Sequence, residues 1–171
     1  KIFKDKAIKN VVDYTVGIEV GLDSNGRKNR GGTAMEAVVE TFITDICKSH
    51  GFCYIKQATS EKVLAKWKLK LSVDKSSRRF DFAVYNGKRL YLIETNYYGG
   101  GGSKLKSTAG EYKALYDFIS KDGHKFIWIT DGLGWESTTR HLEETFNHIE
   151  YLLNLKMLTV GLLEDIITRG L

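Results

Sequence analysis

The stretch DFAVYNGKRLYLIETN, residues 81–96, constrains the fold more than any other part of the sequence. Runs of aromatic, β-branched and leucine residues flank Asn86-Gly87, a pair that suits the positive φ angles of a two-residue type I′ turn. We therefore expect a tight antiparallel hairpin in which Tyr85 pairs with Lys88. Such a hairpin commits the chain to a sheet that contains antiparallel strands.

Three polar residues of this hairpin have no role in forming it. The expected register sets Asp81 opposite Leu92 and Arg79 opposite Glu94. Because paired residues share a face, as do residues two apart on a strand, Asp81, Glu94 and Asn96 project to one side. Asp81 and Glu94 become diagonal neighbours there, with Cβ atoms about 7 Å apart or less. Two acids beside an apolar patch need compensation, either an Arg79–Glu94 ion pair or an oxygen-ligated metal such as Mg²⁺.

The sequence before the hairpin predicts a loop, a helix and a strand. Residues 11–32 are polar and end in GLDSNGRKNRGG, which is typical of an open loop. From Thr33 onward, apolar residues recur at helical spacing. Thr33 and Glu36 form a capping-box pattern, which gives Glu36 a structural explanation. FCYIKQ, residues 52–57, predicts a short strand.

The sequence after the hairpin predicts a helix, a strand and further helices. Thr108 and Glu111 form a second capping box, at the start of a helix with Tyr112 on its inner face. KFIWIT, residues 125–130, predicts a buried strand. Ser137 is expected to cap another helix, and a last amphipathic helix runs to about residue 168. The expected inward residues of the helix after Ser137 are Leu142, Phe146, Ile149 and Leu153.

This order predicts an α/β fold with a central mixed sheet of about four strands, in the order αβββαβ followed by C-terminal helices. The 171 residues, 42% of them hydrophobic, suit a single domain. Neither a membrane span nor a secretory leader is visible, so we expect a soluble, cytoplasmic protein. Two cysteines cannot supply a zinc tetrad or a disulfide framework.

The net charge of +5 favours a polyanionic partner. Seven lysines and arginines lie in residues 62–80 against the single acid Asp74. Arg27, Lys28 and Arg30 lie between glycines, a composition that allows close approach to phosphates. The alternative is that both stretches are solvated surface.

These motifs resemble the PD-(D/E)XK nuclease superfamily, in which an acid on one strand and an E-x-K on the next hold Mg²⁺ within a helix, three strands, helix, strand core. Asp81 matches the first acid, and Glu94-Thr95-Asn96 matches the E-x-K. More specifically, GLDSNGRKNRGG with Glu36, and ETNYYGGGGSKLKSTAGEYK, resemble the DpnII/MboI-type restriction endonucleases over about residues 16–135. The resemblance implies Mg²⁺-dependent cleavage of double-stranded DNA at GATC.

The resemblance implies that Asp81 and Glu94 hold the metal. Asn96 stands where lysine is usual, and an amide can orient a water but cannot act as a cation. Our candidate replacement is Lys104, because the flexible glycine tract before it can return its ammonium to the strand that bears Glu94; contact with phosphate or solvent is the alternative. Glu36 is expected to reach the metal directly or through a water, or to serve as a cap alone.

Recognition of GATC needs side chains that suit guanine, adenine and phosphate. The candidate DNA-binding residues are Arg27, Lys28, Asn29, Arg30, Ser103 and Lys106. A palindromic site cut on both strands favours a homodimer. We expect residues 1–171 to form one catalytic domain that lacks a further N-terminal segment. The alternatives are a non-catalytic DNA-binding module on a nuclease-like scaffold and a PD-(D/E)XK nuclease of other specificity.

Overall fold

The computed structural model describes residues 27–170, with side chains from residue 32 onward. The strands are β1 (Cys53–Ala58), β2 (Phe80–Tyr85), β3 (Leu90–Tyr97), β4 (Lys125–Asp131) and β5 (Tyr151–Leu153). The helices are α2 (Arg27–His50), α3 (Ser60–Trp67), α4 (Ser103–Ser120), the 3₁₀ helix η2 (Leu133–Thr138), α5 (Thr139–Phe146), α6 (Leu155–Thr159) and α7 (Leu162–Arg169). None of the helices in this part of the chain could span a membrane.

The five strands form one mixed sheet in the order β1-β2-β3-β4-β5. The pairs β1–β2 and β2–β3 are antiparallel, whereas β3–β4 and β4–β5 are parallel. The parallel connection from β3 to β4 runs through α4, as a crossover requires. The predicted α/β class and mixed sheet are confirmed, and β5 is an additional strand at the edge.

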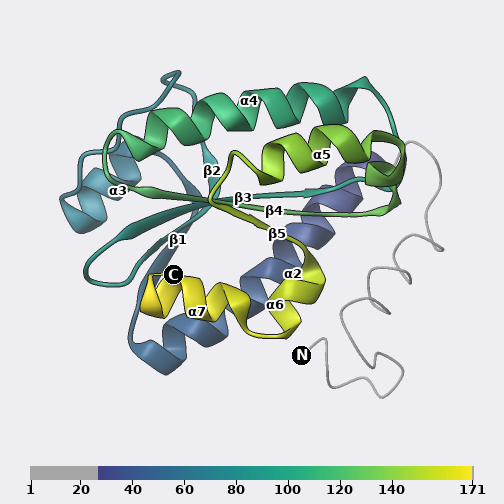
Figure 1. Ribbon diagram of the computed structural model, residues 1–171. Helices are drawn as coiled ribbons and strands as arrows, with labels where there is room; N and C mark the ends of the chain where they lie inside the picture. The colour runs from purple at the N-terminus through teal and green to yellow at the C-terminus, as the bar shows by residue number, and fades with distance from the viewer. Residues whose placement is uncertain (1–26, 171) are drawn as a thin grey trace, which may run out of the picture.

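Helices cover both faces of the sheet, with α4 and α5 on one side and α2, α6 and α7 on the other (Figure 1). On the α4 side, Ala83, Leu92 and Trp128 are fully buried against helix residues that include Leu115. On the other side, Ile93 and its neighbours pack against α2, α6 and α7. The alternation of side chains along β3 therefore separates two apolar cores.

The hairpin forms, but its turn is longer than predicted. Tyr85 pairs with Leu90 instead of Lys88, so four residues connect β2 and β3. The cause is the Asn86 side chain, whose Oδ1 accepts hydrogen bonds from the backbone N–H of Lys88 at 2.9 Å and of Arg89 at 2.8 Å. Because the register moves by two residues, every side chain keeps the face that the sequence predicted.

Both capping-box predictions for helix starts are wrong. Helix α2 begins at Arg27, so residues 27–32 are helical instead of a loop, and residues 11–26 lie outside the described part. Thr33 and Glu36 therefore lie within the helix. Extending an existing helix costs less free energy than nucleating a new one at Thr33. Likewise α4 begins at Ser103, five residues before Thr108.

The C-terminal third contains shorter helices than predicted. Helix α5 ends at Phe146, whose side chain is exposed, whereas Ile149 and Leu153 are buried beyond the helix. Ser137 belongs to η2 and donates to the Gly134 carbonyl, so it does not cap α5. The last helix is split into α6 and α7 at Gly161, which has a φ of 87°.

The unpredicted helix α3 lies along β1, the first strand of the sheet. Thr59 caps this helix by accepting a hydrogen bond from the backbone N–H of Lys62. The Lys66 ammonium donates to the Tyr54 carbonyl at 3.0 Å, and that of Lys62 to the Gln57 carbonyl at 2.9 Å. Lys68 likewise donates to the Ala65 carbonyl at 3.2 Å, so three lysines of the basic stretch bind backbone of the protein itself.

Candidate active site at the fork of two strands

The candidate site lies where β2 and β3 separate. Their pairing ends at Phe82 and Ile93, one step before Asp81 and Glu94 would face each other. The Asp81 Oδ2 atom instead accepts hydrogen bonds from the backbone N–H of Thr95 at 2.8 Å and from its hydroxyl at 2.9 Å. Burial raises the pKa of Asp81, while these two hydrogen bonds act in the opposite direction. The fork therefore holds the Asp81 carboxylate in one position.

Glu94 is held on the neighbouring strand by a residue of α4. Its side chain is 6% exposed, and the Tyr112 hydroxyl donates a hydrogen bond to Oε2 at 3.2 Å. The Tyr112 ring packs edge-to-face on Trp128, with ring centroids 5.0 Å apart. Burial, and next the charge of Asp81, raise the pKa of Glu94 to about 8. Without a cation, Glu94 therefore holds a proton at neutral pH.

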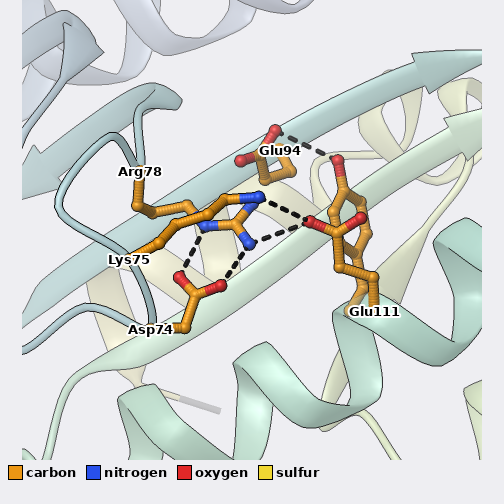
Figure 2. A network of polar contacts seen from close by, with 6 residues as sticks. Asp74, Lys75, Arg78, Glu94 and Glu111 are labelled. Atoms are coloured by element: carbon orange, nitrogen blue, oxygen red, sulfur yellow. Dashed lines mark hydrogen bonds and ion pairs between the residues drawn. The ribbon is translucent and has the colours of Figure 1, made fainter.

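Arg78, whose charge acts on Glu94, is already committed to two other acids (Figure 2). The buried Arg78 guanidinium forms two hydrogen bonds to Asp74, at 2.8 and 2.6 Å, and one to Glu111 at 2.8 Å. Lys75 lies 3.5 Å from the same Glu111 carboxylate. Arg78 lowers the pKa of Glu94, but burial and Asp81 outweigh it. Glu111 thus serves an ion pair instead of a helix cap.

The predicted alternative of an Arg79–Glu94 ion pair is wrong. No such pair exists among the described residues, because the register moved by two and Arg79 is exposed. Arg79 instead acts on Asp81, where its charge lowers the pKa. Within the described part of the chain, the two acids of the fork therefore have no ion-pair partner of their own.

Glu36 of α2 approaches the fork from the opposite face of the sheet. Its Oε2 atom accepts a hydrogen bond from the Gln57 amide at 3.1 Å. Burial raises the pKa of Glu36, and the charge of Asp81 is the second cause. Glu36 and Asp81 are thus close enough for their charges to interact, and a role of Glu36 at a metal stays a prediction. Gln57 was missed, because one glutamine in a strand gives no sequence signal of its own.

Asn96 has its amide fixed by the core. Its Oδ1 atom accepts a hydrogen bond from the indole N–H of Trp128 at 2.9 Å. The Nδ2 donor therefore points away from Trp128, and no described residue binds it. This leaves a fixed hydrogen-bond donor two residues from Glu94.

The structure does not bring Lys104 to the carboxylates. Lys104 lies in the first turn of α4, eight residues before Tyr112, which corresponds to about 12 Å along the helix axis. Its side chain is exposed, as are those of Ser103 and Lys106. The other candidate DNA-binding residues, 27–30, form the start of α2, and their side chains lie outside the described part.

Comparison with known proteins assigns the family. Residues 1–165 match the family model for the DpnII restriction endonuclease. The chain belongs to this family.

Curated relatives of this DpnII-family chain are type II restriction enzymes. MjaIII from Methanocaldococcus jannaschii is 51% identical over 98% of this chain and 60% of its own length. LlaDCHI from Lactococcus lactis subsp. cremoris is 46% identical over 97% of this chain and 56% of its own length. DpnII from Streptococcus pneumoniae is 37% identical over 96% of this chain and 59% of its own length. The chain thus spans less than two thirds of the length of these relatives. Among solved structures, protein VC1899 from Vibrio cholerae is similar with a TM-score of 0.43 and 15% identity, over 87% of this chain and 35% of that one.

The donor set in this DpnII-family chain fits a divalent cation. Within residues 27–170, no three acidic, histidine or cysteine side chains lie close enough together to hold a metal ion. Asp81 and Glu94 are therefore the pair that could hold one, and Glu36 is close enough to Asp81 for their charges to interact. Mg²⁺ is usually held by one or two carboxylates and keeps several waters, so such a pair suits it. A cation there also relieves the repulsion between Asp81 and Glu94.

Proposed function

We propose that the protein is a Mg²⁺-dependent type II restriction endonuclease that hydrolyses phosphodiester bonds of double-stranded DNA at GATC. The observation that carries this proposal is the pair Asp81 and Glu94 at the strand fork, in a chain of the DpnII family: Glu94 is buried, Asp81 is half-buried, and neither forms an ion pair with a described residue. The choice of GATC is supported by the two motifs that resemble DpnII/MboI-type enzymes.

Asp81 and Glu94 would hold a Mg²⁺ ion, which would supply Lewis-acid activation of the scissile phosphate and of the attacking water. Thr95 orients Asp81 through two hydrogen bonds, and Tyr112 orients Glu94 through one. Water attacks phosphorus in line, one P–O bond breaks, and the leaving oxygen takes a proton. Asn96 is suited to orient the attacking water, because Trp128 fixes its amide and no described residue binds the Nδ2 donor.

Lys104 remains our proposal for the missing lysine. Its position in the first turn of α4 requires movement of the glycine-rich segment before it to reach the developing charge. We expect Lys104→Ala to abolish cleavage and to leave folding and DNA binding intact, as measured by plasmid cleavage, circular dichroism and a gel-shift assay. Lys121→Ala, at the exposed C-terminal end of the same helix, is the matched control. A Lys104→Ala protein with wild-type cleavage refutes this role.

The DNA contacts proposed for Arg27, Lys28, Asn29 and Arg30, with Ser103 and Lys106, rest on their chemistry and on the family motif. The basic stretch 62–80 contributes less than its charge implied. Lys62 and Lys66 bind backbone carbonyls, while Lys75 and Arg78 pair with acids. We further propose a homodimer, because a palindromic site is cut on both strands.

Cleavage of plasmid DNA tests the function. The intact protein, incubated with unmethylated plasmid and Mg²⁺, should give discrete fragments that end at GATC, and Asp81→Asn should give none. Random smearing indicates a nuclease of other specificity. Binding without cutting indicates a non-catalytic DNA-binding module, the alternative that Asn96 favours because it replaces the usual lysine.

A further inference from the structure

Gln57 has a backbone conformation that its place in the fold does not explain. Its φ of 47° lies in the left-handed region, although it is a strand residue with a side chain. The other described non-glycine residue with positive φ is Lys68, at the C-terminal cap of α3, where this conformation is common. In β1, by contrast, the left-handed backbone occurs within a strand. Such conformations concentrate at functional sites.

The irregularity of Gln57 coincides with the carboxylates. The β1–β2 ladder pairs Lys56 with Phe82 and Ala58 with Phe80, but it omits the position where Gln57 would face Asp81. The left-handed turn of the chain thus falls at the same level of the sheet as the strand fork.

The Gln57 amide links two acids from separate elements. Its Nε2 atom donates to Glu36 of α2 at 3.1 Å. A hydrogen bond from the same side chain lowers the pKa of Asp81 on β2. The backbone of Gln57 is held from a third element, because the Lys62 ammonium of α3 donates to its carbonyl at 2.9 Å. The amide is therefore bound to Glu36 and lies close enough to Asp81 to affect it.

We propose that Gln57 is a positioning residue of the metal site, whose amide holds Glu36 at a set place beside Asp81. This inference rests on the proposed function. Two nearby carboxylates repel each other until a cation binds, and a neutral donor between them offsets that repulsion without competing as a charge. Mg²⁺ demands near-ideal geometry, so acids that are held in advance bind it more tightly.

The substitution Gln57→Gly distinguishes the contribution of the side-chain amide from that of the backbone conformation. Glycine adopts the left-handed conformation at no steric cost, so the variant loses the amide and relieves the backbone. Lys68→Gly is the matched control, because it relieves a similar φ of 60° in α3, outside the carboxylate cluster. Calorimetric titration of the intact protein with MgCl₂ without DNA, the Mg²⁺ dependence of plasmid cleavage, and the melting temperature in EDTA are the three measurements.

For Gln57→Gly we expect the half-saturating Mg²⁺ concentration to rise about tenfold or more, the usual effect of losing a partner that orients metal ligands. The melting temperature in EDTA should not fall. Lys68→Gly should keep wild-type Mg²⁺ dependence. An unchanged Mg²⁺ requirement in Gln57→Gly overturns the assignment, as does the same loss in Lys68→Gly.

A second variant covers the case in which Gln57→Gly does not fold. Gln57→Asn tolerates left-handed backbone but withdraws the amide by one methylene, and the same rise in Mg²⁺ requirement is expected. A wild-type protein that binds Mg²⁺ but cuts no DNA refutes the proposed endonuclease, while weaker Mg²⁺ binding by Gln57→Gly still supports the role of Gln57. A wild-type protein that binds no Mg²⁺ overturns both.

Discussion

Glu94→Gln should make the metal-free protein more stable, and the gain should grow with pH. In the folded protein, burial and then Asp81 raise the pKa of Glu94 from its ordinary 4.5 to about 8, against the opposing effects of Tyr112 and Arg78; Glu111 adds to the rise. Glutamine keeps the shape of the side chain and the ability to accept the Tyr112 hydrogen bond. It removes the group that must ionise.

The sign follows from which state binds more protons. Below pH 4.5, Glu94 is protonated in both the folded and the unfolded chain and costs nothing. Between pH 4.5 and about 8, the unfolded chain releases the proton and the folded chain keeps it, so folding stability falls with rising pH. At about 1.4 kcal/mol for each pH unit, the loss reaches about 5 kcal/mol above pH 8.

Urea denaturation in EDTA at pH 5 to 8.5 measures this effect. The unfolding free energy of Glu94→Gln minus that of wild type should increase by about 4 kcal/mol between pH 5 and pH 8. The raised pKa values of Asp81 and Glu36 give slopes of the same sign in both proteins, so the difference reports Glu94. Glu143→Gln, at an exposed site on α5, is the control. A difference that stays constant with pH refutes the reasoning.

Three further substitutions test the packing around the site. Tyr112→Phe removes the donor to Glu94 and keeps the ring, so urea denaturation in EDTA should show an unfolding free energy lower by about 1 kcal/mol. An unchanged unfolding free energy contradicts this role. Gly132→Ala should cost more than about 2 kcal/mol in thermal unfolding, because φ is 114° and the new Cβ would lie 2.2 Å from the Tyr98 carbonyl oxygen. Gly110→Ala, in open space on α4, should instead gain about 0.5–1 kcal/mol, and equal shifts for both glycines would contradict the structure.

The sequence predicted the architecture well because periodicity reports which side of an element is buried. It located the hairpin and the carboxylate face, and an error of two residues in register did no harm because strands repeat every two residues. The turn length was missed because it depends on the Asn86 side chain binding two backbone amides, which the Asn-Gly pattern does not specify.

Helix ends were predicted less well for a physical reason. The pattern of Thr33 with Glu36, and that of Thr108 with Glu111, also occurs inside helices, where nothing marks it as different from a cap. Glu111 instead meets Arg78, a partner 33 positions away in sequence. Pairings of this kind follow from the folded arrangement and leave no local pattern.

In the candidate site, too, local features were predicted and contacts between distant elements were not. The shared face of Asp81 and Glu94 was predicted because the alternation of side chains along one hairpin is a local property. Gln57 and Arg78 were missed because their partners lie on α2 and α4, whose placement against the sheet is decided by packing of the whole domain. The sequence thus predicted the acids and not the residues that hold them.

The lysine contacts of α3 have a consequence for solubility. Strand β1 is an edge of the sheet, and exposed edges recruit strands of other chains into aggregates. The ammonium groups of Lys62 and Lys66 occupy carbonyl oxygens of this strand and place positive charge beside it. An incoming strand would have to displace both. We therefore expect helix α3 to hinder edge-to-edge aggregation. Neutral residues at positions 62 and 66 should lower the protein concentration at which aggregates form.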